Sequence, residues 1–270
     1  MRITKRAVTP PTPTDTDPDF ASLFAAEDRH FWFRARNRVL GELLRTITAS
    51  MPAGYRVLEV GCGNGNVLRV LEHVCDRGTV IGVDVVKERL RLARHRVRCQ
   101  LIQADINNWP FRTPFDVIGL FDVLEHLSDD RRLLRQLYHG LAPGGHLVLT
   151  VPAHRHLWSY SDVYAKHYRR YAPKELEEAL GESGFAVEYL SPFMGVLYPL
   201  MWLGRRLAAW GQPTGAQCPV REMFHRELRI IPVFNDLLSW LLGMEAQRIA
   251  RRERLPLGTS LLAVARREGR

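Results

Sequence analysis

The residues of this sequence that could do chemistry begin at a glycine-rich turn. The apolar run 56–60 leads into Gly61, Gly63 and Gly65, and Asp84 closes the next apolar run. A turn built of glycines lets a ligand come close to the backbone, and an acidic residue about 20 positions further on can bind ribose hydroxyls. The spacing therefore predicts a site for a ligand that carries a ribose.

Two observations argue against NAD as that ligand. The NAD-type fingerprint requires a glycine at position 66, where this chain has Asn66. An oxidoreductase would also carry a hydride-transfer acid such as Tyr-x-x-x-Lys, and neither Tyr160 nor Tyr164 is followed by lysine four residues later. A dehydrogenase is therefore the weaker interpretation.

With Glu59 two residues before the first glycine, the segment 59–65 resembles motif I of the class I S-adenosylmethionine-dependent methyltransferases. The resemblance extends over positions 53 to 190 and the last strand. It implies that S-adenosylmethionine is the cofactor, that Asp84 takes its ribose hydroxyls, that Asp105 meets its adenine amino group and that Ile106 packs against the ring. The cofactor-binding residues that it implies are Glu59, Gly61, Gly63, Gly65, Asp84, Asp105, Ile106 and Asp122.

A second part of the resemblance concerns the segment 121–126, which is similar to the fourth-strand motif of small-molecule methyltransferases beside the sulfonium. Methyl transfer is an in-line displacement, so positioning supplies much of the acceleration. A base with a pKa near neutrality helps when the acceptor is a hydroxyl or phenol, and histidine has such a pKa. We predict His126 as the first catalytic candidate, with His167 and His154 as alternatives; the competing interpretation of His126 is a packing or capping role.

The predicted substrate side follows the fifth strand, where ligands bind in open parallel sheets. A Trp-Ser-x-x-Asp stretch ends at Asp162, and a His-x-Arg-Arg-Tyr block covers 167–171. Together with the aromatic start at 30–36, these segments resemble a poorly characterised bacterial group of methyltransferases, although Lys166 stands where that group usually has glycine. The predicted substrate residues are His154, Asp162, Arg169 and Arg170. The two arginines could bind a phosphate or carboxylate, or they could be an exposed pair ahead of a helix.

The elements that must position these residues alternate between strand and helix. Helical segments at 65–74, 87–95 and 129–140 separate most of the strand candidates, which indicates a parallel sheet wrapped by helices. The predicted fold is an α/β Rossmann-like, mostly parallel seven-stranded sheet with helices on both faces. The strand candidates are 56–60, 79–83, 99–103, 115–121, 145–151, 186–190 and 257–265.

Around this core we predict three additions. They are a disordered leader at 1–19, a helical lid at 20–50 and a helical insertion at 192–255; the core itself occupies 51–191, and the last strand with the tail occupies 256–270. The insertion carries Trp202, Trp210 and Trp240 on two apolar stretches, each too short to span a bilayer. Such helices suit a bilayer surface or a roof over an apolar acceptor, or they could be core helices or a dimer interface.

Composition limits the function without choosing it. The net charge of +9 favours anionic partners, but no basic stripe interleaved with aromatic residues appears, so nucleic acid is disfavoured. The four cysteines form no C-x-x-C pair, which argues for reduced thiols and predicts no metal site.

These observations predict a cytoplasmic methyltransferase, peripheral at the inner membrane face. It would methylate a small-molecule or lipid-linked acceptor, by O-methylation. The alternative is a non-catalytic cofactor-binding module or membrane-surface scaffold of the same fold.

Overall fold

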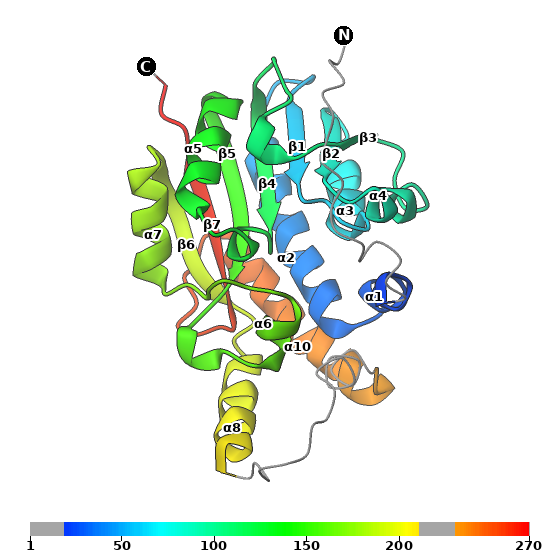
Figure 1. The fold of residues 1–270 in the computed structure, drawn as a ribbon, viewed down its shortest axis with the longest axis vertical. Helices are drawn as coiled ribbons and strands as arrows, with labels where there is room; N and C mark the ends of the chain where they lie inside the picture. The colour runs from blue at the N-terminus through cyan, green and yellow to red at the C-terminus, as the bar shows by residue number, and fades with distance from the viewer. Residues whose placement is uncertain (1–18, 211–229, 270) are drawn as a thin grey trace.

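The computed structural model describes residues 19–210 and 230–269 (Figure 1). Its centre is a seven-stranded sheet in the order β3-β2-β1-β4-β5-β7-β6. All neighbouring strands pair in parallel except β7, which runs antiparallel to both β5 and β6. This arrangement confirms the predicted fold. The strands are β1 (Arg56–Val60), β2 (Thr79–Asp84), β3 (Gln100–Gln103), β4 (Phe115–Phe121), β5 (Leu141–Pro152), β6 (Ala186–Phe193) and β7 (Ser260–Arg266).

Helices cover both faces of the sheet, because successive strand residues point to opposite sides. On one face Val57 and Val117 pack against α2 (Phe31–Thr48), α3 (Asn66–Val74) and α10 (Pro232–Ala250). On the other face Leu58 and Ile118 pack against α5 (Asp130–Gly140) and α7 (Pro173–Glu182). The remaining helices are α1 (Asp19–Glu27), α4 (Lys87–Ala93), α6 (Tyr160–Tyr164) and α8 (Leu197–Trp210), with short 3₁₀ turns η1 (Ile106–Asn108), η2 (Leu124–His126) and η3 (Arg155–Leu157).

The predicted lid is two helices instead of one continuous helical pattern. The chain leaves α1 at a turn in which the amides of Arg29 and His30 both donate to the carbonyl of Ala26. The His30 side chain then accepts from the amide of Trp32 and caps the start of α2. A side-chain acceptor at this position satisfies one of the free amides of a helix start. The predicted leader falls, but for its last residue, outside the described part of the chain.

The predicted insertion contains α8 and α10, and α10 is apolar on two sides. Leu242, Ala246 and Ile249 are buried in the core beside α2. Another side of the helix, which includes Phe234, Leu237 and Met244, is exposed. The carboxyl ends of β1 and β4 point toward α2 and α6, whereas α8 projects away from the sheet (Figure 1).

Candidate functional site

The glycine turn after β1 has two distinct requirements for glycine. Gly61 has φ +71°, and a Cβ there would lie 2.6 Å from a methyl group of Val123. Gly63 has φ +51°, and among the described residues the only atom within 4 Å of an added Cβ is the Gly61 carbonyl oxygen at 4.0 Å. The first glycine therefore allows close packing against the β4 end, whereas the second borders open space that a ligand can enter.

Asp84 holds this turn in place from the end of β2. One carboxylate oxygen accepts the amide of Gly63 at 2.8 Å, and the other accepts the amide of Val86 at 2.8 Å. A carboxylate oxygen can accept a second hydrogen bond, so both oxygens can still receive hydroxyl groups. Asp84 is thus placed to fix the turn and to bind a ribose together.

Glu59 lies under the turn with 3% of its surface exposed. Among the described residues, its Oε2 atom has no hydrogen-bond partner. Burial raises the pKa of Glu59 to about 8, although the positive charge of Arg36 acts in the opposite direction. The side chain is therefore a buried acid next to the cofactor turn.

The adenine side of the predicted site follows β3. Asp105 caps η1 by accepting the amide of Asn107 at 2.9 Å, and Ile106 is half-buried against the core. A surface pocket of about 390 Å³ lies beside these residues; Asp105, Asn108 and Ser128 are among those that line it. Asp105 and Ile106 therefore lie at the carboxyl edge of the sheet, as their predicted role requires.

The end of β4 is joined to the N-terminal helices by an ion pair. Asp122, whose φ of 55° is unusual for a residue other than glycine, contacts the guanidinium of Arg36 at 2.7 Å. Arg36 also lies over the Trp32 ring, with 4.8 Å to the ring centroid. The arginine that ends the aromatic start motif thus reaches the predicted methyl-transfer position.

The side chain of Asn66 makes contacts that a glycine at position 66 could not make. Its side chain accepts from the Nδ2 of Asn37 at 2.9 Å and from Arg36 at 3.4 Å, and it donates to the carbonyl of Glu27 at 3.2 Å. The first residue of α3 thus ties α1 and α2 to the cofactor turn. Neither Arg36 nor Asn66 was among the predicted site residues, because their partners are distant in the sequence.

Asp162 organises the first half of the His-x-Arg-Arg-Tyr block. It is fully buried, and its Oδ1 atom lies 3.0 Å from the Nδ1 of His167 and 2.8 Å from the Nε of Arg170. Burial opposes the charged form, but hydrogen bonds from His167 and Arg170 outweigh it and lower the pKa of Asp162 to about 2. Arg170 also donates to the carbonyl of Ala153. Of the predicted substrate residues, Asp162 and Arg170 thus pair with each other.

Asp130 organises the second half of the block. Its carboxylate accepts from Arg169 at 3.0 Å and from the Tyr171 hydroxyl at 2.8 Å. Burial opposes ionisation, but these partners and Arg131 lower the pKa of Asp130 overall. Arg169 also donates to the carbonyls of Leu127 and Ser128. The guanidinium of Arg169 therefore fixes the segment after η2. Asp130, which we did not predict as a site residue, holds both Arg169 and Tyr171 in place.

His126 and His167 come together at the carboxyl edge of the sheet. Their ring centroids lie 4.7 Å apart at an interplanar angle of 79°. The Nε2 of His167 faces Glu125, 3.9 Å from its Oε1. Burial of part of the ring, with His167 and Arg89 nearby, lowers the pKa of His126. The two predicted catalytic residues are therefore neighbours, and Glu125, which lies inside the recognised motif, joins them.

His154 lies in a different environment. Its ring stacks on His156 with a centroid separation of 5.2 Å, and it meets the edge of Tyr198 at 5.4 Å. Burial lowers the pKa of His154, and electrostatic interactions with His156 and Arg170 lower it further. These contacts connect the end of β5 with α8, so the structure places His154 on the insertion side of the edge.

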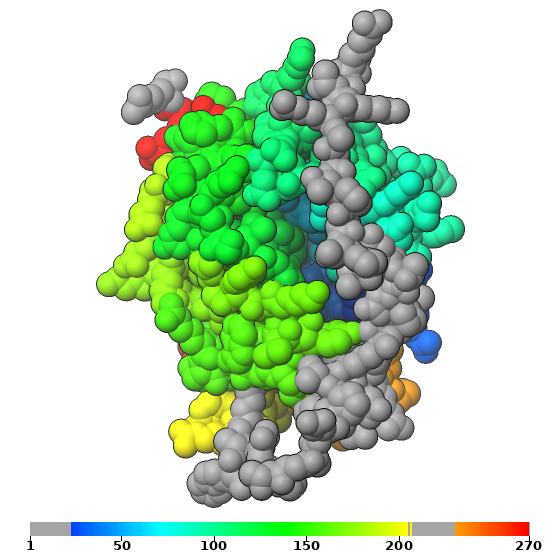
Figure 2. Space-filling view, viewed as in Figure 1, coloured from blue at the N-terminus to red at the C-terminus, as the bar shows by residue number. Residues whose placement is uncertain are grey.

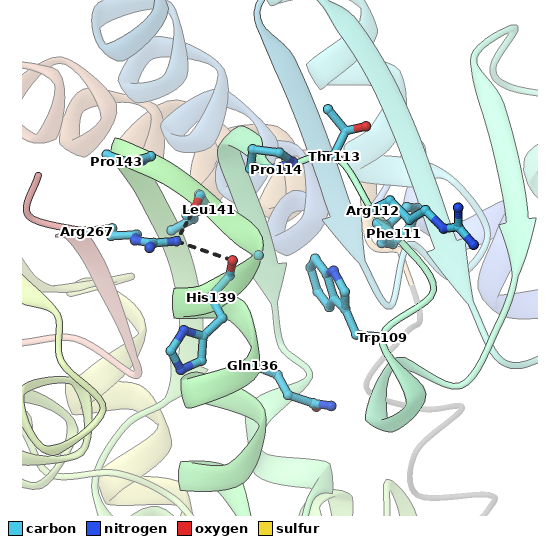
Figure 3. A pocket seen from close by; sticks show the side chains of 11 residues that line it. Trp109, Phe111, Arg112, Thr113, Pro114, Gln136, His139, Leu141, Pro143 and Arg267 are labelled. Carbon is cyan, nitrogen blue, oxygen red and sulfur yellow. Dashed lines mark hydrogen bonds between the residues drawn. The ribbon is translucent and has the colours of Figure 1, made fainter. Parts of the chain in front are cut away.

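A larger pocket lies at the opposite edge of the sheet. It has a volume of about 490 Å³, and Figure 3 shows Trp109, Phe111 and Gln136 along it. Arg267 donates to the carbonyls of His139 and Leu141 there. Since ligands of open parallel sheets bind at the carboxyl ends of the strands, this pocket at the amino ends of β4 and β5 is not the cofactor site.

In Figure 2 the segment between β5 and α7, which includes the His-x-Arg-Arg-Tyr block, covers the lower middle of the face that is shown. Beyond it, α8 and α10 expose large apolar side chains. None of the helices in the described part of the chain is long and apolar enough to cross a membrane. The exposed residues are Leu200, Trp202, Leu203, Ile231, Val233, Phe234, Leu237, Trp240 and Met244.

Comparison with known proteins gives the family context of this geometry. A family described as "Methyltransferase domain" matches residues 24–190. A trans-aconitate 2-methyltransferase of Azoarcus sp. (strain BH72) is 34% identical over 118 residues, which are 43% of this chain and 46% of that protein. The corresponding enzyme of Yersinia pestis (strain Pestoides F) is 32% identical over 139 residues, 51% of this chain and 50% of its own. The chain thus spans about half the length of the curated relatives it matches.

Solved structures share the fold at low identity. A chain from the complex between the Haloferax volcanii Trm112 methyltransferase activator and a methyltransferase has a TM-score of 0.57 and 19% identity, covering 95% of this chain and 97% of its own. The Haemonchus contortus phosphoethanolamine N-methyltransferase 2, solved with S-adenosylhomocysteine, has a TM-score of 0.52 and 21% identity. The match covers 84% of this chain and 52% of the Haemonchus chain.

Proposed function

Because this chain belongs to the methyltransferase domain family, we propose that it transfers the methyl group of S-adenosylmethionine to an oxygen of a small anionic molecule. The family match confirms the predictions of a class I methyltransferase and of S-adenosylmethionine as its cofactor. The identity of the acceptor and of the methylated atom is what we propose in addition.

One observation carries the proposal, which is that His126 and His167 meet at the sheet edge that holds the glycine turn. His126 is the last residue of η2, the 3₁₀ turn after β4, and Val123 just before this turn packs against Gly61. In the proposed complex the cofactor lies along Gly63 and Asp84, and the acceptor oxygen lies between the sulfonium and the two histidines. Hydrogen-bonding groups at this place orient an oxygen nucleophile for in-line attack.

The reaction balances without an additional reactant. A lone pair of the acceptor oxygen forms a bond to the methyl carbon while the S–CH₃ bond breaks. The electron pair of that bond stays on sulfur, which converts the sulfonium to neutral S-adenosylhomocysteine. A hydroxyl acceptor releases its proton to the surrounding buffer, whereas a carboxylate acceptor has no proton to lose.

Charge supports an anionic acceptor. The chain has a net charge of +9, and the positive charge of Arg89 acts directly on His126. The curated relatives named above methylate trans-aconitate by their names, so a small polycarboxylate is the acceptor class to test first.

A second candidate is a lipid-linked acceptor at a membrane surface. It is favoured by the exposed face of α10, where Phe234 and Trp240 are 63% and 62% exposed. Arg206, beside the Trp202 ring on α8, supplies a cation of the kind that binds anionic headgroups next to interfacial aromatic residues.

The experiment uses methyl-labelled S-adenosylmethionine, the purified chain and extract from its host, followed by separation into organic and aqueous phases. Label in the aqueous phase, increased by added polycarboxylates, supports the small anionic acceptor. Label in the organic phase supports the lipid-linked candidate. Absence of label in both phases, although S-adenosylhomocysteine binds by calorimetry, would favour the non-catalytic module.

A further inference from the structure

Three side chains near the proposed acceptor position offer metal-ligating atoms to one point. Glu125 and His126 come from the 3₁₀ turn after β4, and His167 comes from the segment after α6. One ligand atom from each lies within 4.8 Å of the others. Ligands of a common ion lie roughly 3–4 Å apart when each is about 2.1 Å from the metal, so small side-chain rotations suffice to close the set.

Glu125 is not satisfied by its protein partners. Its side chain is 1% exposed, and among the described residues its Oε2 atom has no hydrogen-bond partner. The Nε2 of His167 lies 3.9 Å from Oε1, which is too far for a hydrogen bond. A buried carboxylate without a partner is costly, and coordination of a cation is one way to compensate it.

The surroundings of His167 are those of a metal ligand. Its Nδ1 is held by the buried carboxylate of Asp162 at 3.0 Å, which leaves Nε2 directed at Glu125 and His126. Metal-ligating histidines typically donate their other ring N–H to a carboxylate in this way. The charge of Arg170 does not oppose a cation strongly, because it is paired with Asp162 and the carbonyl of Ala153.

The backbone keeps the two segments in register. The amide of Tyr168, the residue after His167, donates to the carbonyl of Glu125 at 2.8 Å. Distant parts of the chain are thereby joined at the three side chains, so the set is preformed by the fold.

We propose that Glu125, His126 and His167 bind one divalent transition-metal ion, such as Mn²⁺ or Zn²⁺. One carboxylate and two imidazoles suit these ions, and three protein ligands leave coordination positions open. His126 is exposed at the surface, so the open side is accessible to a ligand. Cysteine spacing gives no sign of this site, because its ligands are nitrogen and oxygen atoms from separate segments.

The role of the ion in catalysis rests on the proposed function. An oxygen of the acceptor would occupy an open position of the ion and be held for attack on the methyl carbon. The histidines then act on the acceptor through the metal, and a hydroxyl proton leaves to buffer more easily because the cation stabilises the oxygen anion. The S–CH₃ bond still breaks with its electron pair returning to sulfur.

The binding experiment needs neither cofactor nor acceptor. The full chain, without a histidine tag and stripped with a chelator, is titrated with MnCl₂ or ZnCl₂ by calorimetry. We expect saturable binding of one ion, weakened by about tenfold or more in Glu125→Gln, His126→Asn and His167→Asn. The matched control is His95→Asn, at an exposed histidine outside the three-residue set, which should bind as the parent does. Asp162 positions His167 but does not itself bind the ion. Asp162→Asn should therefore weaken metal binding less than His167→Asn does.

A spectroscopic measurement on the parent protein covers the case in which a variant fails to fold. Electron spin-echo measurements of bound Mn²⁺ should show coupling to two histidine nitrogens. No saturable binding, absence of nitrogen coupling, or equal binding by the folded ligand variants would overturn the metal site. If the ion binds but no acceptor is methylated, the site stands and the proposed function fails. If chelation leaves turnover unchanged, the catalytic role of the ion is overturned.

Discussion

Arg36 of α2 and Asp122 at the end of β4 form an ion pair of 2.7 Å between side chains that are 9% and 21% exposed. This pair connects the N-terminal helices to the place where the sulfonium is expected. Because Arg36 also binds Asn66, one guanidinium joins α2, the start of α3 and the end of β4. Formation of the cofactor site is therefore coupled to docking of α2.

The first prediction concerns this pair. Arg36→Met should lower the free energy of unfolding by about 3 kcal/mol, because it leaves a largely buried carboxylate unpaired. It should also weaken S-adenosylhomocysteine binding by calorimetry. The control is Arg34→Met on the same helix, whose pair with Asp236 is 48% and 74% exposed and should be worth less than about 1 kcal/mol. Equal effects of the two substitutions would contradict the coupling.

Asp84 should be essential for cofactor affinity. Asp84→Ala removes the predicted acceptor of the ribose hydroxyls and releases the amide of Gly63, so binding of S-adenosylhomocysteine should weaken by about tenfold or more, or about 1.4 kcal/mol. Asp84→Asn keeps the volume and isolates the charge. The exposed Asp76→Ala on the same protein should bind normally, and unchanged affinity of Asp84→Ala would refute the assignment.

Two glycines of the turn should respond differently to valine. At Gly63 the added side chain enters open space, so Gly63→Val should abolish cofactor binding and cost about 1–3 kcal/mol of backbone strain in a protein that still folds. At Gly61 the side chain meets Val123 at 2.6 Å, so Gly61→Val should destabilise the fold further. Thermal denaturation and calorimetry on both variants measure the two effects; full cofactor binding by Gly63→Val would sink the placement.

Glu59 should make stability depend on pH. Its folded pKa is about 8, above the ordinary value of 4.5, so the folded state holds the proton more tightly than the unfolded state. The stabilisation is complete below about pH 4.5 and is lost as pH rises through about 8, at up to about 1.4 kcal/mol per pH unit. The neighbouring charges are Arg36, Asp84 and Glu27.

Glu59→Gln should remove this contribution and flatten the pH profile measured by chemical denaturation of the cofactor-free protein. The exposed Glu42, paired with Arg45 on the surface of α2, supplies the control variant Glu42→Gln, whose profile should follow the parent. A parallel profile for Glu59→Gln would show that the buried acid does not titrate in this range.

The lipid-linked candidate requires the exposed face of α10 to bind membranes. Removing the whole insertion would also remove Leu242 and Ala246 from the core, so substitutions are the sharper test. A triple change of Phe234, Leu237 and Trp240 to Ser should reduce recovery with anionic liposomes in flotation, if this face binds membranes. Val163→Ser, at a residue 58% exposed on α6, is the control. Equal recovery of all proteins would leave the small-molecule acceptor as the remaining candidate.

The glycine turn, the acidic residue after β2 and the alternation of strands and helices could be predicted from the sequence. Each depends on contacts within one element or between neighbours: Asp84 binds Gly63 across a single βα unit, and the strands follow their own apolar periodicity. The motif resemblance added the family and the cofactor because such motifs are local segments.

Only the tertiary structure decided which distant side chains meet. The partners of Arg36, the approach of His167 to Glu125 and the anchoring of Arg169 by Asp130 all join segments from different parts of the chain. For α10 the helix was predictable, but its buried side was not, since both faces are apolar and the choice depends on α2. Periodicity specifies the conformation of one element, whereas packing between elements determines which of its residues are buried, paired or free to bind a ligand.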